Sequence, residues 1–305
     1  MTFELVADVV PSGGVRLANG FTARMEDWQA VAVTAFAAGK DALGRPAYAT
    51  CTAALVGEKV LLTAAHCLDT GKDKEFRKAF LQVDGRSLDV TCDPDPRYFA
   101  AKYKGRSPRS SFDFALCELS WTGLKPATLD SMTFETVDTE TSLRPISGGG
   151  KPVVLTGYGC SGLQVENHRL TFTADTGIFR IGQEAIETGV SASGTEPGYV
   201  ILRSGKGVEP ALCPGDSGGP LMSGLKVVPP LKPDGVATLI SDGDRRVRGV
   251  NSSIDFEDRA QGPYDYISRV SALAGTGFDS YARGWLKRHA NASICGLSTG
   301  AARCI

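Results

Sequence analysis

The stretch Cys213-Pro214-Gly215-Asp216-Ser217-Gly218-Gly219-Pro220 places one serine in a glycine-rich turn, beside an aspartate and four residues after a cysteine. A serine hydroxyl is a weak nucleophile at neutral pH, so it needs a base for its proton and N–H donors for the oxyanion that forms. Glycines let the backbone curl until neighbouring N–H groups point at one spot. Gly215 and Ser217 would supply these N–H groups, since Pro214 has none. The stretch therefore predicts a nucleophilic Ser217 with an oxyanion hole.

The chain has three histidines from which the base could come. His66 follows the apolar run VLLTAA at 60–65, where a predicted strand enters a tight turn, and such a turn presents a side chain from a rigid scaffold. His168 lies in a polar stretch, and His289 lies near the end of a predicted terminal helix. We therefore expect His66 to be the base. Asp113, a single acid among apolar residues at 111–116, is the candidate that would orient its imidazole.

Three motifs together resemble the trypsin/chymotrypsin family of serine proteases. They are Thr-Ala-Ala-His-Cys at 63–67, Asp-Phe-Ala-Leu at 113–116 and Gly-Asp-Ser-Gly-Gly-Pro at 215–220. Their order is that of chymotrypsin and differs from that of subtilisin or the α/β-hydrolases. The resemblance implies a serine endopeptidase in which Ser217 attacks the scissile carbonyl, His66 moves the proton and Asp113 orients the imidazole, through an acyl-enzyme. It implies neither a cofactor nor a metal ion.

Two other functions would use the same residues. Protease-like domains can lose activity and serve as binding proteins, usually after one residue of the triad is lost, and here all three are present. An esterase that acts on non-peptide acyl groups would keep the whole triad. Whether the substrate spans both barrels of the cleft would distinguish the esterase from a peptidase.

Composition and charge narrow the class of partner. The 305 residues include 33 basic and 34 acidic side chains, so the net charge of −1 favours neither nucleic acid nor an anionic membrane. No apolar run is long enough to span a membrane. The first ten residues lack the basic start and apolar core of a signal peptide. We expect a monomer that acts on protein or peptide substrates.

Short apolar runs separated by turn residues predict a mainly β chain. They lie at 30–36, 59–64, 79–83, 115–119, 152–156, 199–202, 236–240 and 246–250. Only 280–290 has helical periodicity, with Tyr281, Trp285 and His289 four residues apart. The pattern fits the all-β fold that the resemblance implies, two packed six-stranded β-barrels with a C-terminal helix.

The resemblance also suggests how the chain is divided. We predict an activation leader at 1–16, a first barrel at 17–135 with His66 and Asp113, a second barrel at 136–277 with Ser217, and a helix with a cysteine-containing tail at 278–305. The connection between the barrels should lie within the polar, glycine-rich residues 123–150. The Pro-rich segment at 227–235 should form a loop that interrupts a hairpin, and a surface insertion is favoured over a partner-binding element.

The eight cysteines favour an oxidising compartment, where disulfides persist. In the family that the chain resembles, cysteines at the positions of Cys51 and Cys67 form a disulfide around the histidine. We further predict the pairs Cys92–Cys117, Cys160–Cys213 and Cys295–Cys304, while spacing alone leaves other pairings and buried free thiols open. We therefore expect a secreted or periplasmic protein.

Residues Arg16-Leu17-Ala18-Asn19-Gly20 resemble the activation site of the family, a basic residue followed by Ile-Val-x-Gly. Cleavage after Arg16 would free the α-amine of Leu17. In the family, that amine turns inward and pairs with the aspartate beside the serine, here Asp216, so that a buried charge gains a partner and the oxyanion hole is ordered. The resemblance implies a zymogen with a separate activating protease. Because Leu-Ala replaces Ile-Val, a plain linker strand at 15–19 is the alternative.

The resemblance places the floor of the specificity pocket two residues before Cys213, at Ala211, which offers no charge to a basic side chain. Ser252, Ser253 and Ile254 take the positions of the family's Ser-Trp-Gly strand, and Gly262 falls near the far wall. Ser252 would also hydrogen-bond Asp113, as in the family. Because Ile254 would narrow the pocket mouth, we expect small or medium apolar residues before the scissile bond. The alternative is an acid at 255, 257 or 258 that reaches a basic substrate side chain.

Overall fold

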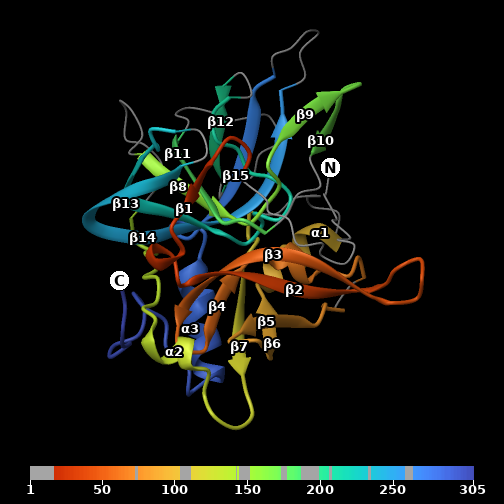
Figure 1. The fold of residues 1–305 in the computed structure, drawn as a ribbon. Helices are drawn as coiled ribbons and strands as arrows, with labels where there is room; N and C mark the ends of the chain where they lie inside the picture. Colours follow the sequence, from red (N-terminus) through yellow and green to blue (C-terminus); the bar gives the residue numbers. More distant parts are fainter. Residues whose placement is uncertain are drawn as a thin grey trace.

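The computed structural model describes residues 17–72, 75–103, 111–141, 143, 152–172, 177–186, 199–205, 208–232, 235–257 and 264–305. Within these residues the chain forms two β units, which lie one above the other in Figure 1, and three short α-helices. Arg16, Asp258 and Gly262 lie outside the described residues.

The first unit is a closed six-stranded barrel, as the sequence predicts. Its strand order is β2-β3-β4-β7-β6-β5, and every neighbouring pair is antiparallel. The strands are β2 (Val31–Lys40), β3 (Pro46–Gly57), β4 (Val60–Thr63), β5 (Ala79–Val83), β6 (Arg86–Pro94) and β7 (Ala115–Ser120). Large side chains such as Phe36, Leu62 and Leu81 are buried in its core, which explains why these runs are so apolar.

The second unit is a seven-stranded sheet with the order β1-β11-β8-β13-β14-β15-β12. Its strands are β1 (Phe21–Ala23), β8 (Pro152–Gly157), β11 (Arg180–Ala185), β12 (Tyr199–Ser204), β13 (Pro220–Val228), β14 (Val236–Phe256) and β15 (Tyr266–Ala272). A bridge from Ile186, just after β11, to Leu202 in β12 brings the two sides of the sheet together. A separate hairpin consists of β9 (Leu163–Glu166) and β10 (Arg169–Phe172). Apart from β1, the sheet thus has the six strands predicted for the second barrel.

Residues 17–23 pair with the second unit, whereas the sequence analysis assigned them to the first barrel. β1 is antiparallel to β11 and parallel to β14. Leu17 and Ala18 are fully buried in the core of the second unit. Gly182 makes room there, because a Cβ on it would collide with the side chains of Leu17 and Pro210. Burial of these apolar residues explains the difference, and the first barrel begins only at β2.

The predicted C-terminal helix is α3 (Phe278–Arg288), which begins at Phe278 rather than Ser280. It packs on the first barrel, where the ring of Phe278 contacts Phe114 and the Tyr281 hydroxyl accepts a hydrogen bond from the N–H of Leu116. The tail beyond it returns to the first unit, since the N–H of Cys295 donates to the carbonyl of Val56. Two helices were not predicted, α1 (Pro96–Tyr103) and α2 (Ala127–Ser131).

Two predicted strand runs, 236–240 and 246–250, belong to the single long strand β14. The register against β13 shifts between Ser223 and Leu225, next to Gly224, so β14 continues through its polar middle residues as a bulge. The charged residues in that bulge interrupt the apolar pattern and hide the continuity of the strand. The first two residues of the Pro-rich segment, Val227 and Val228, end β13, and its other described residues, 229–232 and 235, lie between β13 and β14.

Four disulfides are present, and all four match the predicted pairs: Cys51–Cys67, Cys92–Cys117, Cys160–Cys213 and Cys295–Cys304. They are distributed over both units and the C-terminal tail. In the parts of the chain that the structure describes, no helix is both long and apolar enough to cross a membrane.

Candidate active site

His66 and Asp113 meet at one edge of the first barrel. His66 lies in the 3₁₀ turn Ala65–Leu68, directly after β4, and Asp113 lies just before β7. Because β4 and β7 are antiparallel neighbours with Thr63 opposite Ala115, these two flanking residues lie side by side. The backbone N–H of His66 donates to Oδ1 of Asp113 at 2.8 Å, and Nδ1 lies 2.7 Å from Oδ2.

Asp113 also receives a hydrogen bond from the second unit. Ser252 lies in β14, and its Oγ donates to Oδ2 of Asp113 at 2.5 Å. Asp113 is only 1% exposed, so its carboxylate depends on these donors in place of water. The predicted hydrogen bond between Ser252 and Asp113 is confirmed. It joins the two units at the site.

The loop with Ser217 packs directly on the strands that carry His66. The N–H of Thr52 in β3 donates to the carbonyl of Ser217 at 2.8 Å. Gly218 has a φ of +83°, and a Cβ on it would collide with the Thr63 side chain and the Thr52 carbonyl. Since Thr63 ends β4, three residues before His66, this glycine lets the serine loop approach the histidine turn.

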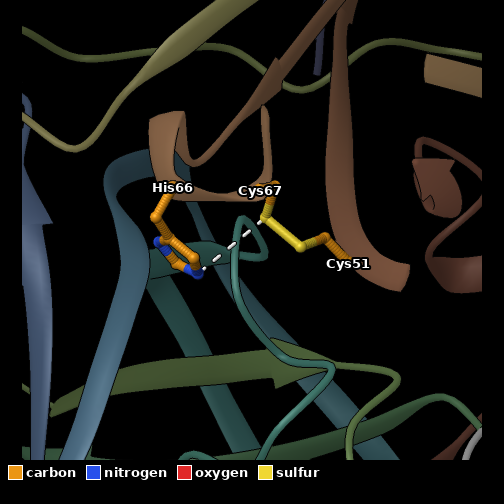
Figure 2. Close-up of side chains that lie close together, drawn as sticks. All are labelled: Cys51, His66 and Cys67. Atoms are coloured by element: carbon orange, nitrogen blue, oxygen red, sulfur yellow. Dashed lines mark hydrogen bonds between the residues drawn. A yellow bond between two sulfur atoms is a disulfide. The ribbon is translucent and has the colours of Figure 1, made fainter. Parts of the chain in front are cut away.

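In the residues that the structure describes, no hydrogen bond joins the side chains of Ser217 and His66. Nε2 of His66 instead faces Sγ of Cys67 at 3.9 Å, and Figure 2 shows the Cys51–Cys67 disulfide beside the imidazole ring. Nucleophile–base hydrogen bonds are often long in the absence of substrate and shorten only in the substrate complex. The arrangement is therefore compatible with proton transfer from Ser217 to His66.

The serine loop leaves two backbone N–H groups available. The N–H groups of Asp216, Gly218 and Gly219 donate to the carbonyls of Cys213, Asn251 and Asp216, respectively. Among the described residues, those of Gly215 and Ser217 have no acceptor. The φ of +101° at Gly215 is a conformation that favours glycine. These two groups are the donors that the sequence predicts for an oxyanion.

Asp216 is fully buried between the serine loop and the end of β8. Its Oδ1 accepts a hydrogen bond from the N–H of Gly159 at 2.7 Å, and its Oδ2 accepts one from the N–H of Cys213 at 2.8 Å. A side chain on Gly157 or Gly159 would collide with this carboxyl group. Burial raises the pKa of Asp216 well above its usual value, and the two N–H donors only partly offset that effect. In the described chain, no cationic side chain contacts Asp216.

Two of the residues predicted for the specificity pocket, Ala211 and Ile254, lie in the core of the second unit. Ala211 is fully buried, and Ile254, at 3% exposure, belongs to the same apolar cluster together with Leu212. Ser253 is half-buried. Two of the three acids that could have favoured a basic substrate have basic partners of their own, because Asp255 binds Arg269 and Glu257 binds Arg203, and the third, Asp258, lies outside the described residues.

The two other histidines lie elsewhere. His289 stacks on Trp285 with ring centroids 4.0 Å apart and contacts Glu118 and Asp93 on the first barrel. His168 lies in the turn that joins β9 to β10. His66, by contrast, follows the strand against which the serine loop packs.

Three residues outside the sequence motifs help to build the site. Thr52 donates from its Oγ1 to the carbonyl of Gly215, and Asn251 donates from Nδ2 to the carbonyls of Thr156 and Asp216. Tyr199 in β12 places its hydroxyl 3.3 Å from Oγ of Ser252. Of the three, only Thr52 has a signal in the sequence, because it follows the predicted disulfide cysteine Cys51. The other two are brought in by strand pairing.

One group of side chains has the composition of a metal site. The ligand atoms of Cys51, His66 and Cys67 lie within 4.8 Å of one another. Both sulfur atoms belong to a disulfide, however, and the ligand form of cysteine is the thiolate. These residues therefore do not fit a metal centre.

The fold is shared with a known class of enzyme. The chain is similar to a solved structure described as a thermostable serine protease, AL20, from an extremophilic microorganism, with a TM-score of 0.52 and 12% sequence identity over 85% of this chain and 97% of that one. The Trypsin family model matches residues 18–274, and the chain therefore belongs to the trypsin family of serine proteases. No curated protein matches the sequence. The protein is accordingly a serine endopeptidase, a hydrolase with a chymotrypsin-like fold.

Proposed function

We propose that the protein cleaves peptide bonds with a triad of Ser217, His66 and Asp113. The observation that carries this proposal is the pair of hydrogen bonds from His66 to Asp113, at the edge of the barrel on which the Ser217 loop packs. With Nδ1–H donated to Asp113, Nε2 is left as the acceptor for the serine proton.

The reaction follows from these positions. Ser217 Oγ attacks the scissile carbonyl carbon while Nε2 of His66 takes its proton, and the free N–H groups of Gly215 and Ser217 bind the oxyanion. The imidazolium then gives the proton to the leaving amine as the peptide bond breaks, which leaves an acyl-enzyme. Water, deprotonated by His66, releases the acid and restores Ser217. Asp113 stabilises the imidazolium at both stages.

Labelling with a fluorophosphonate probe tests the triad. After cleavage near Arg16, the probe should add its mass at Ser217 in the wild-type protein and not in Ser217→Ala, which should also lose turnover of peptide substrates by several orders of magnitude. Ser131→Ala, in an exposed part of α2, is the matched control. Peptide turnover by the S217A variant at the wild-type rate contradicts the proposal. Hydrolysis of esters without peptides would favour the esterase.

We also propose that the protein is made as a zymogen and that cleavage after Arg16 activates it. The buried Asp216 carboxyl group supports this proposal, since it has two backbone donors and no cationic partner in the described chain. Leu17 lies in the core of the same unit, and the carbonyl of Ala18 accepts a hydrogen bond from the N–H of Ala211 at 3.0 Å. The freed amine of Leu17 would supply the missing positive charge.

Intact mass after probe exposure, with and without cleavage near Arg16, tests activation. Labelling only after cleavage is the expected result. Labelling of the uncut chain would show that the site forms unaided and would exclude a zymogen. Labelling in neither state would favour a catalytically silent binding protein.

We propose a preference for small or medium apolar residues before the scissile bond. The buried Ala211 and Ile254 support it, as do the arginine partners of Asp255 and Glu257. Ile254→Gly should widen the pocket and raise kcat/KM for a phenylalanine substrate relative to an alanine one. A wild-type protein that cleaves best after Arg or Lys contradicts the proposal.

We infer that the protein acts outside the cytoplasm as a monomer. The four disulfides support an oxidising compartment, and members of the trypsin family are typically extracellular. An activating protease and peptide substrates are the expected partners.

A further inference from the structure

Tyr199 reaches the hydrogen-bond network of the triad from β12, which is separated in the sheet by β15 from β14, the strand of Ser252. It begins β12 and pairs with Ser271 in β15, and Ser271 also pairs with Val250 in β14. The register of β14 against β15 shifts between Asn251 and Ser253, so Ser252 lies at an irregularity in the ladder. Ser252 is 6% exposed, and the Tyr199 hydroxyl lies 3.3 Å from its Oγ.

The chemistry of the three groups fixes the direction of the hydrogen bonds. A serine hydroxyl has one proton, and Ser252 uses it to donate to Oδ2 of Asp113 at 2.5 Å. Oγ of Ser252 then has only lone pairs to offer to Tyr199. The phenol must therefore be the donor. In the resulting chain of hydrogen bonds, Tyr199 donates to Ser252 and Ser252 donates to Asp113. Asp113 also accepts the hydrogen bond from Nδ1–H of His66.

We propose that Tyr199 is a positioning residue for the His66–Asp113 pair. A serine hydroxyl rotates freely, and the hydrogen bond from Tyr199 favours the orientation in which Ser252 donates to Asp113. This inference rests on the proposed triad. Tyr199 and Ser252 belong to the second unit, whereas His66 and Asp113 belong to the first. The chain of hydrogen bonds thus makes the orientation of the imidazole depend on both units.

A different role for Tyr199 would have a different kinetic effect. The residue is half-buried and lies near Ser252, in the strand that the family resemblance assigns to the specificity pocket, so its ring could simply contact the substrate. Loss of a substrate contact that is equal in the ground and transition states raises KM and leaves kcat unchanged. Loss of a positioning hydrogen bond lowers kcat and leaves KM nearly unchanged.

Steady-state kinetics of the activated protein on a peptide substrate separate these roles. Tyr199→Phe removes only the hydroxyl, and we expect a loss of about 2- to 10-fold in kcat, the effect of one neutral hydrogen bond, with KM within about twofold. Ser252→Ala should lose at least as much. The double variant should be no slower than S252A alone, because Tyr199 acts through Ser252. Tyr266→Phe, which removes a hydroxyl hydrogen-bonded to the carbonyl of Leu163 in the same unit, is the control and should keep the wild-type kcat.

An NMR measurement tests the inference without turnover. The resonance of the Nδ1–H proton of His66 reports its hydrogen bond to Asp113, and it should shift in Y199F and stay unchanged in Y266F. An unchanged kcat together with an unchanged resonance in Y199F overturns the inference, as does a raised KM at constant kcat or a full additional loss in the double variant. If the wild-type protein itself is inactive, the proposed function fails, and the resonance still decides the role of Tyr199.

Discussion

Asp113 and Asp216 are two buried aspartates, one hydrogen-bonded to His66 and one within the serine loop, and they differ in what surrounds them. Asp113 is 1% exposed and has three donors, two from His66 and one from Ser252. Asp216 is 0% exposed and has two, both backbone N–H groups. Burial raises the pKa of Asp216 well above its usual value of 3.8. Although both carboxyl groups are equally buried, Asp113 has a histidine and a serine as partners, whereas Asp216 has backbone donors and no positively charged partner among the described residues.

Two glutamates, the buried Glu135 and the half-buried Glu184, extend the comparison. Glu135 is fully buried and bound by Arg245, which also stacks over Trp28; burial raises the pKa of Glu135, and Arg245 opposes that effect. Glu184 has a buried Oε1 without a hydrogen-bond partner, and burial, with a smaller effect from Glu209, raises its pKa to about 8. The four acids therefore differ in their partners, from an arginine at Glu135 to no cation at Asp216 or Glu184 among the described residues. A substitution can test each of them separately.

The largest expected effect is on the rate of catalysis, in Asp113→Asn. The amide keeps the shape of the side chain but no longer stabilises the imidazolium or its tautomer. We expect kcat to fall about 10⁴-fold, as this change does in a Ser-His-Asp triad, while far-UV circular dichroism stays unchanged. Asp89→Asn, on β6, is the control. A loss below tenfold would show that Asp113 is only structural.

The next effect is on stability, in Arg245→Met. This variant leaves the charge of Glu135 buried and unpaired, and we expect the free energy of unfolding to fall by about 3–5 kcal/mol. Adding Glu135→Gln removes the stranded charge and should recover a large part of the loss. Urea denaturation of the single and double variants measures both. Equal losses in the two would mean that packing of Arg245 on Trp28 matters more than the ion pair.

Asp216 predicts how stability depends on pH. Because its folded-state pKa is raised, the uncleaved folded chain binds more protons than the unfolded chain above about pH 4, and its stability falls as pH rises. An α-amine freed by cleavage after Arg16 would pair with the carboxylate and remove this loss. We expect Tm of the cleaved protein to exceed that of the uncleaved one by about 5 °C at pH 7 and not at pH 4. Asp216→Asn should abolish the pH dependence of this difference in Tm. If the Tm values of the cleaved and uncleaved wild-type proteins differ by the same amount at every pH, the proposed ion pair is contradicted.

The smallest effect concerns Glu184. With a folded-state pKa of about 8 and an ordinary value near 4.5 when unfolded, this carboxyl group contributes stability below pH 4.5 that is lost as pH rises toward 8. Glu184→Gln should therefore raise Tm by about 2 °C at pH 8.5 and leave it unchanged at pH 4. Glu75→Gln, at an exposed site, is the control. A gain that is the same at both pH values would rule out the titration of Glu184 as its cause.

The sequence by itself determined the class of the protein and pointed to the residues that we propose as its triad. The motifs around His66, Asp113 and Ser217 depend on local requirements, such as a glycine at positive φ in the serine turn, and these are visible in the chain. The short apolar runs predicted a mainly β chain, the four-residue periodicity predicted α3, and the family resemblance supplied the barrels and the Cys51–Cys67 pair. The other three predicted cysteine pairs are also present. Backbone conformation and burial restrict the type of residue at single positions, so a single sequence is enough to reveal them.

Only the tertiary structure decided how distant strands meet. It assigned residues 17–23 to the second unit, continued β14 through its charged bulge, and brought Tyr199 next to Ser252. It also distinguished Asp113 from Asp216, since all three donors to Asp113 and one of the two donors to Asp216, the N–H of Gly159, come from residues far away in the chain. No local pattern encodes such pairings, because the free energy that selects them comes from long-range strand pairing and the shared burial of side chains.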